Sequence, residues 1–428
     1  MKSSLINKYT HFKDSGVAWL GKIPEHWELK RLGTRFEERK SKVSDKDFPP
    51  LSVTKQGILP QLDSAAKTND GDNRKLVRKG DFVINSRSDR KGSSGIANID
   101  GSVSLINIVM RPRGIDPSFC NYLLKSTSFV EENYRIGHGI VADLWTTRFD
   151  EMKNIKVAFP SHEEQTAIAQ FLDDKTAKID QAVAQKERLI ALLKERKQIL
   201  IQQAVTQGLD PNVQMKDSGV DWIGEIPEHW EVKPLKYIGN SIIGLTYSPN
   251  DLCEENEGIL VFRSSNLNEG KIIYGEKENV YVRSRIPEKL LVRENDILIC
   301  SRNGSRDLIG KCALISKEDA GASFGAFTTV FRSDVNPYIF CILNSSIFKA
   351  LSGSFLTSTI NQLTIGNLNS IFVPVPPKTE QVELEIYIND FSQKIETAIG
   401  LKEQEIEKLK EYKATLIDSV VTGKVRVC

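Results

Sequence analysis

The sequence lacks the features that would place it in a membrane, secreted or metal-dependent class. No apolar run approaches the roughly 18 residues that a membrane helix needs, and the first residues, MKSSLINKYTHFK, lack the apolar stretch of a secretory signal. The six cysteines form no C-x-x-C pair and no spacing typical of a zinc site. We therefore expect free thiols in a reducing cytoplasm, no bound metal ion and no membrane segment.

Signatures of catalysis are missing as well. The stretch GVAWLGKI (16–23) fits G-x-x-x-x-G-K, but Ile23 stands where a phosphate-binding loop needs Ser or Thr, and no apolar strand precedes it. The five histidines have no clustered partners. We find no paired carboxylates at nuclease-like spacing, and no Asn-Pro-Pro-aromatic tetrapeptide of the kind that amino-methyltransferases use. These absences predict a non-catalytic protein.

The chain also lacks a strong excess of one charge. Its formal net charge is +2, which by itself does not indicate binding to a polyanion. The distribution is uneven, because residues 1–155 carry a net charge of +7 and residues 211–371 a net charge of −3. Any surface that binds a polyanion must therefore be a local patch, strongest near the start of the chain.

What the sequence does contain is a duplication. The passage DSGVAWLGKIPEHWELKRL (14–32) returns as DSGVDWIGEIPEHWEVKPL (217–235), with 14 of 19 positions identical. Further along, LVRKGDFVINSR (76–87) matches LVRENDILICSR (291–302). The order of the matching blocks is the same in both halves, so we interpret the chain as two copies of one unit.

The two copies differ mainly in their middles. Residues 160–206 align without a gap with residues 376–422, whereas most of the extra length of copy two falls within 236–290. One scaffold that carries two different reading surfaces would show this pattern. Loops that merely diverged after a duplication would show it equally well.

Each copy has two parts. The first mixes short strand-like runs with Gly, Asn and Pro turns, which is typical of a compact α+β domain. The second is predicted to be one helix of about 60 Å, because 41 residues at about 1.5 Å each contain no Pro and at most Gly400. We predict two globular domains and two helical segments, bounded as 1–155, 156–210, 211–371 and 372–428.

Both predicted helices carry a heptad seam with lysine at the same two places. A polar residue in an apolar seam lowers stability but fixes register and partner. We therefore expect the helices to pack on each other, with each lysine extending to solvent or pairing with a nearby glutamate. Alternatively, each helix covers only its own domain. The seam residues are Ile179, Val183, Lys186, Ile190, Leu193, Lys197, Leu200, Ile395, Ile399, Lys402, Ile406, Leu409, Lys413 and Leu416.

The polar loops contain residue types that recognise nucleic acid. Arg, Lys, Asn and Gln make paired hydrogen bonds with guanine and adenine edges, and Gly and Ser permit close backbone approach to phosphate. Arg87 and Arg302, which both copies share, fit a structural or phosphate-binding role equally well. The candidate DNA-binding residues are Lys55, Gln56, Arg87, Arg90, Lys91, Arg135, Arg263, Asn266, Arg302, Asn303 and Arg306.

The histidines and tryptophans of the repeated IPEHWE sequence are predicted to be structural. We expect Trp27 and Trp230 to anchor the start of each domain in its core, with the neighbouring His, Glu and Pro shaping the turn.

Taken together, these blocks resemble the specificity subunit of type I restriction–modification systems over nearly the whole chain. The resemblance rests on GxIPEHWExKxL opening each copy, the DFVINSR and DILICSR strands, Glu-Gln after proline at the head of each long helix, and AVTQGLDP and VVTGKV at the ends. It implies an α+β fold with two pseudo-symmetric target-recognition domains joined by two long antiparallel helices that form a coiled-coil spacer.

The resemblance also implies a function and partners. Each domain would read one half of a bipartite, asymmetric double-stranded DNA site in a bacterial or archaeal cytoplasm. Two modification subunits would carry S-adenosylmethionine and methylate adenine N6, and restriction subunits would use ATP and Mg²⁺, so no cofactor is expected on this chain. Two alternatives stay open, namely a stand-alone DNA-binding regulator and a coiled-coil scaffold protein.

Overall fold

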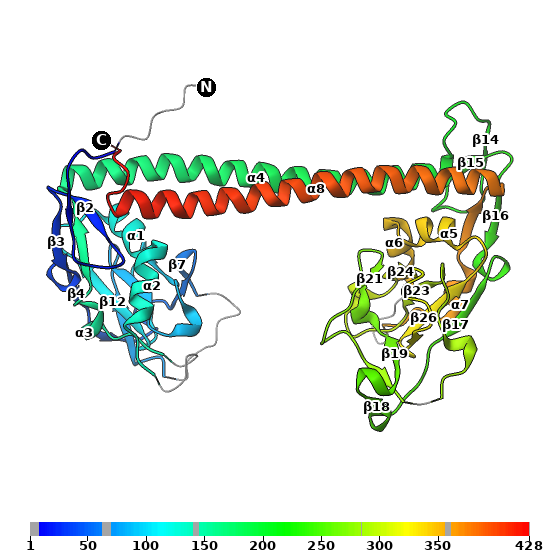
Figure 1. Ribbon diagram of the computed structural model, residues 1–428, viewed down its shortest axis with the longest axis horizontal. Helices are drawn as coiled ribbons and strands as arrows, with labels where there is room; N and C mark the ends of the chain where they lie inside the picture. Colours follow the sequence, from blue (N-terminus) through cyan, green and yellow to red (C-terminus); the bar gives the residue numbers. More distant parts are fainter. Residues whose placement is uncertain (1–7, 62–69, 140–144, 284, 356–360, 428) are drawn as a thin grey trace. The chain divides into compact units, whose positions relative to one another are not determined.

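The computed structural model describes residues 8–61, 70–139, 145–283, 285–355 and 361–427. The chain divides into two compact units, residues 1–186 with 403–428, and residues 187–402 (Figure 1). Each unit contains one α+β domain together with about half of each of two long helices, so the division cuts both helices near their middles.

The first domain is built around an antiparallel four-stranded sheet with the order β10-β9-β12-β4. A three-stranded sheet, β11-β8-β5, and the hairpin β6-β7 lie beside it. The strands are β1 (Phe12–Asp14), β2 (Lys22–Pro24), β3 (Glu28–Arg31), β4 (Phe36–Glu38), β5 (Lys42–Val43), β6 (Leu51–Thr54), β7 (Gly57–Pro60), β8 (Arg74–Val77), β9 (Phe82–Asn85), β10 (Ser94–Ile96), β11 (Gly101–Val103), β12 (Asn107–Pro112) and β13 (Lys156–Phe159). The helices are α1 (Pro117–Lys125), α2 (Thr127–Arg135) and α3 (Phe149–Met152).

The second domain repeats the central sheet as β24-β23-β26-β17 but adds a different second sheet, β18-β22-β19-β25. Its strands are β14 (Met215–Asp217), β15 (Glu225–Pro227), β16 (Glu231–Pro234), β17 (Asn240–Ile243), β18 (Leu252–Cys253), β19 (Ile259–Phe262), β20 (Leu267–Asn268), β21 (Lys271–Ile272), β22 (Tyr281–Val282), β23 (Ile297–Cys300), β24 (Cys312–Leu314), β25 (Ser323–Phe324), β26 (Thr328–Arg332) and β27 (Phe372–Val375). Its helices are α5 (Asn336–Leu343), α6 (Ser346–Ser354) and α7 (Ile365–Ser370).

The matching sequence blocks form the matching parts of the two domains. The last strand of the repeated passage pairs with the strand that leads into the long helix, as β3 with β13 and as β16 with β27. The apolar strands β9 and β23 lie centrally in their sheets with their apolar side chains buried. Trp27 and Trp230 are fully buried in the two cores, as predicted for anchors of the domain starts.

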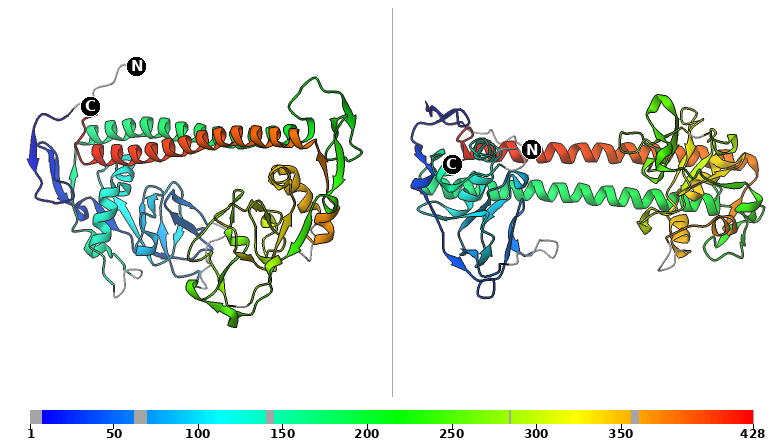
Figure 2. Two further views of the ribbon diagram at one scale, coloured as in Figure 1. Left: turned by 45° about the vertical axis from the view of Figure 1, so that its right-hand side comes forward. Right: turned by 90° about the horizontal axis from the view of Figure 1, so that it is seen from below.

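The long helices are α4 (His162–Gln207) and α8 (Lys378–Val421). Gly208 and Gly423 follow them in the left-handed conformation, at φ of 75° and 76°, which is the usual helix stop. Within each unit the two helices lie side by side and run antiparallel (Figure 2). The predicted fold class is confirmed.

Each long helix contributes to both domain cores, which neither of our two expectations included. Ile168 and Leu172, near the start of α4, lie in the first core, whereas Ile201 and Val205, near its end, lie in the second. Helix α8 does the reverse, with its start in the second core and its end in the first. The helices therefore pack on each other and also on both domains.

Candidate nucleic-acid interface

In the first domain, the candidate loop after β9 comprises residues 86–93. A second stretch of chain holds its start, because the Ser86 carbonyl accepts a hydrogen bond of 3.0 Å from the Thr147 amide, and Arg87 forms a β-bridge with Thr146. The side chain of Arg87 is exposed and, within the described residues, pairs with no carboxylate. A fixed backbone thus presents a cation to solvent.

In the second domain, the loop after β23 comprises residues 301–311 and is held in the same way. The Ser301 carbonyl accepts a hydrogen bond of 2.8 Å from the Leu363 amide, and Arg302 forms a β-bridge with Gln362. This loop is three residues longer than its counterpart. The anchor is therefore common to both domains, and the loop that follows it is not.

Arg302 and Asn303 are positioned by neighbouring side chains. The Arg302 guanidinium lies 5.3 Å from the centroid of the Phe327 ring, which is 60% exposed. Asn303 donates its amide hydrogen to the Ser264 hydroxyl at 2.9 Å. An exposed aromatic ring beside an exposed guanidinium offers both stacking and paired hydrogen bonds to a ligand.

Arg90 and Arg306 each lie in a short 3₁₀ turn within their loop. Both are exposed. Arg90 lies 3.5 Å from the neighbouring Asp89 carboxylate, whereas Arg306 donates to the Gly353 carbonyl at the end of α6 at 3.2 Å. Arg306 therefore has a defined direction, while Arg90 is held only by an exposed, weak ion pair.

Lys91 and Arg135 are neutralised within the domain. The Lys91 ammonium lies 2.6 Å from the Glu131 carboxylate and 4.3 Å from the centroid of the Tyr134 ring. Arg135 donates twice to Glu132, at 2.7 and 2.8 Å, and this hydrogen bonding raises the pKa of the guanidinium. Both side chains would have to exchange a carboxylate for a phosphate to contact DNA, which weakens the prediction for them.

Lys55 and Gln56 form the exposed turn of the β6-β7 hairpin. The Thr54 hydroxyl accepts from the Gln56 amide at 3.2 Å, and Lys125 donates to the Lys55 carbonyl at 3.1 Å. These contacts fix the backbone of the turn and leave both predicted side chains directed outward.

The structure places Arg263 and Asn266 differently from our expectation. Arg263 donates to the Lys277 and Glu278 carbonyls at 3.0 and 3.1 Å. Asn266 is fully buried, where it accepts from the Arg263 amide at 2.9 Å and donates to the Ile273 carbonyl at 3.1 Å. Asn266 has no surface to offer to a base, so the prediction of DNA contact is corrected to a structural role. The Arg263 side chain holds the backbone at residues 277–278.

The second stretch that anchors each loop, residues 145–147 in the first domain and 361–363 in the second, is not evident from sequence motifs. In sequence these residues match at the constant spacing of the long helices that follow, which was the available signal. The sequence does not mark these residues as functional, because neither stretch contains a basic side chain or a repeated motif.

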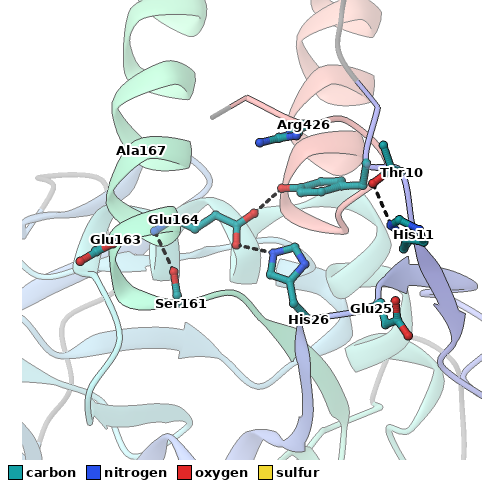
Figure 3. Close-up of a pocket in the computed structure, with 10 residues that line it drawn as sticks. Thr10, His11, Glu25, His26, Ser161, Glu163, Glu164, Ala167 and Arg426 are labelled. Atoms are coloured by element: carbon teal, nitrogen blue, oxygen red, sulfur yellow. Dashed lines mark hydrogen bonds and ion pairs between the residues drawn. The ribbon is translucent and has the colours of Figure 1, made fainter.

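The repeated IPEHWE passage binds the first turn of the long helix. In the first copy, the Trp27 indole donates to Glu164 at 3.1 Å. The His26 ring nitrogen lies 3.0 Å from the other oxygen of the same carboxylate, as Figure 3 shows. The Tyr9 hydroxyl also donates to Glu164, at 2.5 Å. A cavity of about 850 Å³ opens beside this cluster, with Arg426 and His11 in its lining.

The second copy repeats the arrangement with Glu380. Trp230 donates to this carboxylate at 2.8 Å, and the His229 ring nitrogen lies 2.7 Å from its other oxygen. The repeated His and Trp are thus structural, as predicted. The sequence did not reveal that a glutamate about 140 residues further along the chain is their common partner.

The seam residues of the long helices are all buried or half-buried, while most of the intervening positions are exposed. Three of the seam lysines pair with carboxylates of the opposite helix, among them Lys413 with Asp180 at 2.6 Å and Lys197 with Glu396 at 2.7 Å. These two ion pairs occupy equivalent positions in the two copies. Lys186 pairs with Glu405.

The described cysteines are free, and four of them are buried. Burial raises the pKa of Cys300 to about 11 and that of Cys312 to about 12. These thiols are therefore protonated at neutral pH and are poor nucleophiles. No helix within the described ranges is long and apolar enough to span a bilayer.

Comparison with known proteins shows what the chain is similar to. Residues 227–411 match the family described as the type I restriction modification DNA specificity domain. The type I restriction enzyme MjaVIII specificity subunit of Methanocaldococcus jannaschii is 25% identical over 95% of this chain and 94% of its own length.

Two solved structures share the fold. One, described as the structural basis underlying complex assembly and conformational transition of the type I R-M system, aligns with a TM-score of 0.68 at 16% identity over 93% of this chain and 98% of that chain. The crystal structure of the HsdS subunit from Thermoanaerobacter tengcongensis aligns with a TM-score of 0.50 at 16% identity over 94% and 98%. The matched domain and the curated relatives support the predicted family, the type I restriction–modification specificity subunits.

Proposed function

We propose that this chain is the DNA-recognition subunit of a type I restriction–modification complex, in which each α+β domain contacts one half of a bipartite, asymmetric site. One observation carries the proposal. Two central sheets of the same strand order present loops of different length and sequence from the same anchored position, after β9 and after β23. Two sheets of the same strand order that carry different polar loops are suited to recognising two different half-sites.

The exposed or half-buried polar residues of these loops are the proposed DNA contacts. In the first domain these are Arg87 and Arg90, with Lys55 and Gln56 at the neighbouring hairpin. In the second domain they are Arg302, Asn303 and Arg306. Arginine and the side-chain amides can each make two hydrogen bonds with a base edge, and arginine also contacts phosphate. Lys91 and Arg135 have a smaller proposed part because acidic neighbours already pair with them.

The second domain needs help with the DNA backbone. Residues 211–371 carry a net charge of −3, so general attraction to phosphate cannot hold this domain on DNA. We infer that its grip comes from the local cluster around Arg302 and Arg306 and from a partner subunit that contributes phosphate contacts.

The partners follow from the pseudo-symmetry of the scaffold. Equivalent helical surfaces in the two copies would bind two modification subunits, which bring S-adenosylmethionine and methylate adenine N6. Restriction subunits would add ATP-driven translocation and Mg²⁺-dependent cleavage. The chain itself would bind no cofactor, and the complex would work on DNA in the bacterial or archaeal cytoplasm. The domain boundaries proposed above, with spacers at 156–210 and 372–428, stay part of this proposal.

Co-expression with the candidate modification subunit tests the proposal. Native mass measurement is expected to show two modification subunits per chain, and mapping of N6-methyladenine in the host genome is expected to show one bipartite motif. Tight sequence-specific binding by the isolated chain at physiological salt would instead support a stand-alone regulator. An assembled complex without DNA binding or methylation would support a scaffold protein.

A further inference from the structure

The loop anchors place one specific residue opposite each loop arginine. Thr146 is the bridge partner of Arg87, and Gln362 is the bridge partner of Arg302. The flanking hydrogen bonds, from Thr147 to Ser86 and from Leu363 to Ser301, are equivalent as well. The two domains therefore hold the same backbone position with a threonine in one and a glutamine in the other.

The residues that directly precede Thr146 and Gln362 also differ in polarity. Trp145 in the first domain packs on Tyr134, with ring centroids 5.4 Å apart and planes inclined by 31°. Trp145 and Arg87 line a small hollow, together with Asn133, whose buried side-chain oxygen has no hydrogen-bond partner among the described residues. Thr146 itself is half-buried, and its backbone also pairs with that of His138.

The matching position in the second domain is polar. Asn361 donates its side-chain amide to the Gly304 carbonyl at 3.2 Å, which ties this stretch to the loop that contains Arg302. Gln362 follows directly and is half-buried. The second domain therefore carries two amide side chains where the first carries an indole and a methyl-bearing hydroxyl.

This difference in chemistry matches a difference between base edges. A glutamine amide can donate to adenine and accept from it in the major groove, whereas a threonine methyl packs against the methyl group of thymine. Because the bridge to the loop arginine is common to both domains, the exchange of threonine for glutamine changes what a base pair beside that arginine would meet.

We propose that Thr146 and Gln362 determine the base accepted beside the loop arginine in the first and second half-site, Gln362 by pairing with adenine and Thr146 by apolar contact with thymine. Trp145 and Asn361 are positioning residues that hold these side chains toward the loop. The inference rests on the proposed function, and it assigns specificity to a stretch outside the basic loops.

The test exchanges the two side chains in the full chain, co-expressed with its modification subunits. Gln362→Thr is expected to lower methylation at sites with adenine at one position of the second half-site by about 10- to 100-fold relative to other bases there. The first half-site and the spacer length should stay unchanged. Thr146→Gln should alter one position of the first half-site only. Gln214→Thr, the same substitution at an exposed position outside the loops, is the matched control.

A second variant distinguishes a change in base recognition from a loss of folding. Gln362→Glu keeps the size of the side chain but removes the amide donor, so it should disfavour adenine and favour cytosine, whose amino group donates to a carboxylate. Native mass measurement reports assembly of each complex independently of methylation.

The outcomes separate the inference from the function on which it rests. An assembled Gln362→Glu or Gln362→Thr complex that methylates the unchanged motif overturns the inference, as does an equal loss at every sequence variant. If Arg302→Ala still alters the second half-site in that case, the proposed function stands. If the unmodified complex methylates no bipartite motif, the proposed function itself fails.

Discussion

The two domains of this chain keep the same inner frame and differ in their outer parts. Three features recur in both: the central sheet, the pairing of β3 with β13 and of β16 with β27, and the carboxylate that accepts from His and Trp. The accessory sheets differ, as do the loop lengths and the net charges. The recurring strand pair leads into the long helix and the recurring carboxylate lies in its first turn, whereas the parts that differ include the polar loops. Attachment and recognition are thus assigned to separate parts of one domain.

Both domains contain a buried ion pair, but its arginine comes from different strands. Asp81 and Asp296 hold equivalent positions before the central strand, and each is almost fully buried. Asp81 accepts two hydrogen bonds from Arg39, which follows β4, whereas Asp296 accepts two from Arg332 at the end of β26. The two copies retain a buried ion pair but take its cation from different strands.

Each domain is also held by the long helix of the other copy. Asp418 of α8 accepts from the Ser128 amide at the start of α2, at 3.1 Å. Gln198 of α4 accepts from the Ser346 amide at the start of α6, at 2.7 Å. A side chain from the long helix of the other copy thus caps the second helix of each domain. The sequence of one copy alone does not predict this contact.

The largest expected effect comes from the buried tryptophans. Trp27→Ala and Trp230→Ala should each destabilise their own unit by about 3–5 kcal/mol, because a large side chain leaves a cavity and the glutamate loses a donor. Unfolding by denaturant, followed by proteolysis of each unit, would measure the effect. Similar losses are expected for the two variants, and a harmless Trp230→Ala would break the equivalence of the copies.

The buried ion pairs should come next. Removal of one partner from a buried pair leaves an uncompensated charge, which costs about 3–5 kcal/mol and somewhat less here because the arginines are about one-fifth exposed. Asp81→Ala and Asp296→Ala should therefore each destabilise the protein by about 3 kcal/mol. Arg39→Ala should affect only the first unit and Arg332→Ala only the second, as measured by thermal unfolding with unit-specific protease cleavage.

The loop arginines should affect DNA binding and not folding. Arg87→Ala and Arg302→Ala should each weaken binding by the assembled complex by about 1–3 kcal/mol if they contact bases, with relaxed specificity in one half-site. If they contact phosphate, binding to all sequences should weaken alike and the salt dependence should fall by about one charge. Titrations at several salt concentrations distinguish these roles, and unchanged melting temperatures are the control.

The smallest effect is expected at the seam ion pairs. Lys197→Glu should cost less than about 1 kcal/mol, because Glu396 is half-exposed and such pairs contribute little. The reversed pair Lys197→Glu with Glu396→Lys should recover most of that loss. The same cycle at Lys413 and Asp180 should give a slightly smaller coupling, because both side chains are more exposed there. Equal or larger coupling at Lys413 would contradict this burial argument.

The sequence predicted the parts of the fold that depend on local pattern. Long stretches without Pro or Gly, with apolar residues at heptad spacing, identified α4 and α8, and short apolar runs bounded by turn residues identified β9 and β23. The exposed loop residues Arg87 and Arg302 were also found in this way, because they follow those strands directly.

The sequence by itself therefore determined the duplication, the helical seams and the strands, since these follow from periodicity and from the repeated residue pattern. Tertiary structure alone decided which polar side chains are buried and what they meet. The sequence predicts Asn266 as a DNA contact, but its side chain fills a turn. Glu164 is not among the residues predicted from sequence, yet it holds the start of the first domain. The physical reason is that segments far apart in sequence determine the environment of a polar side chain. Trp27 and Glu164, for example, are 137 residues apart, and the local sequence pattern does not indicate that they come into contact.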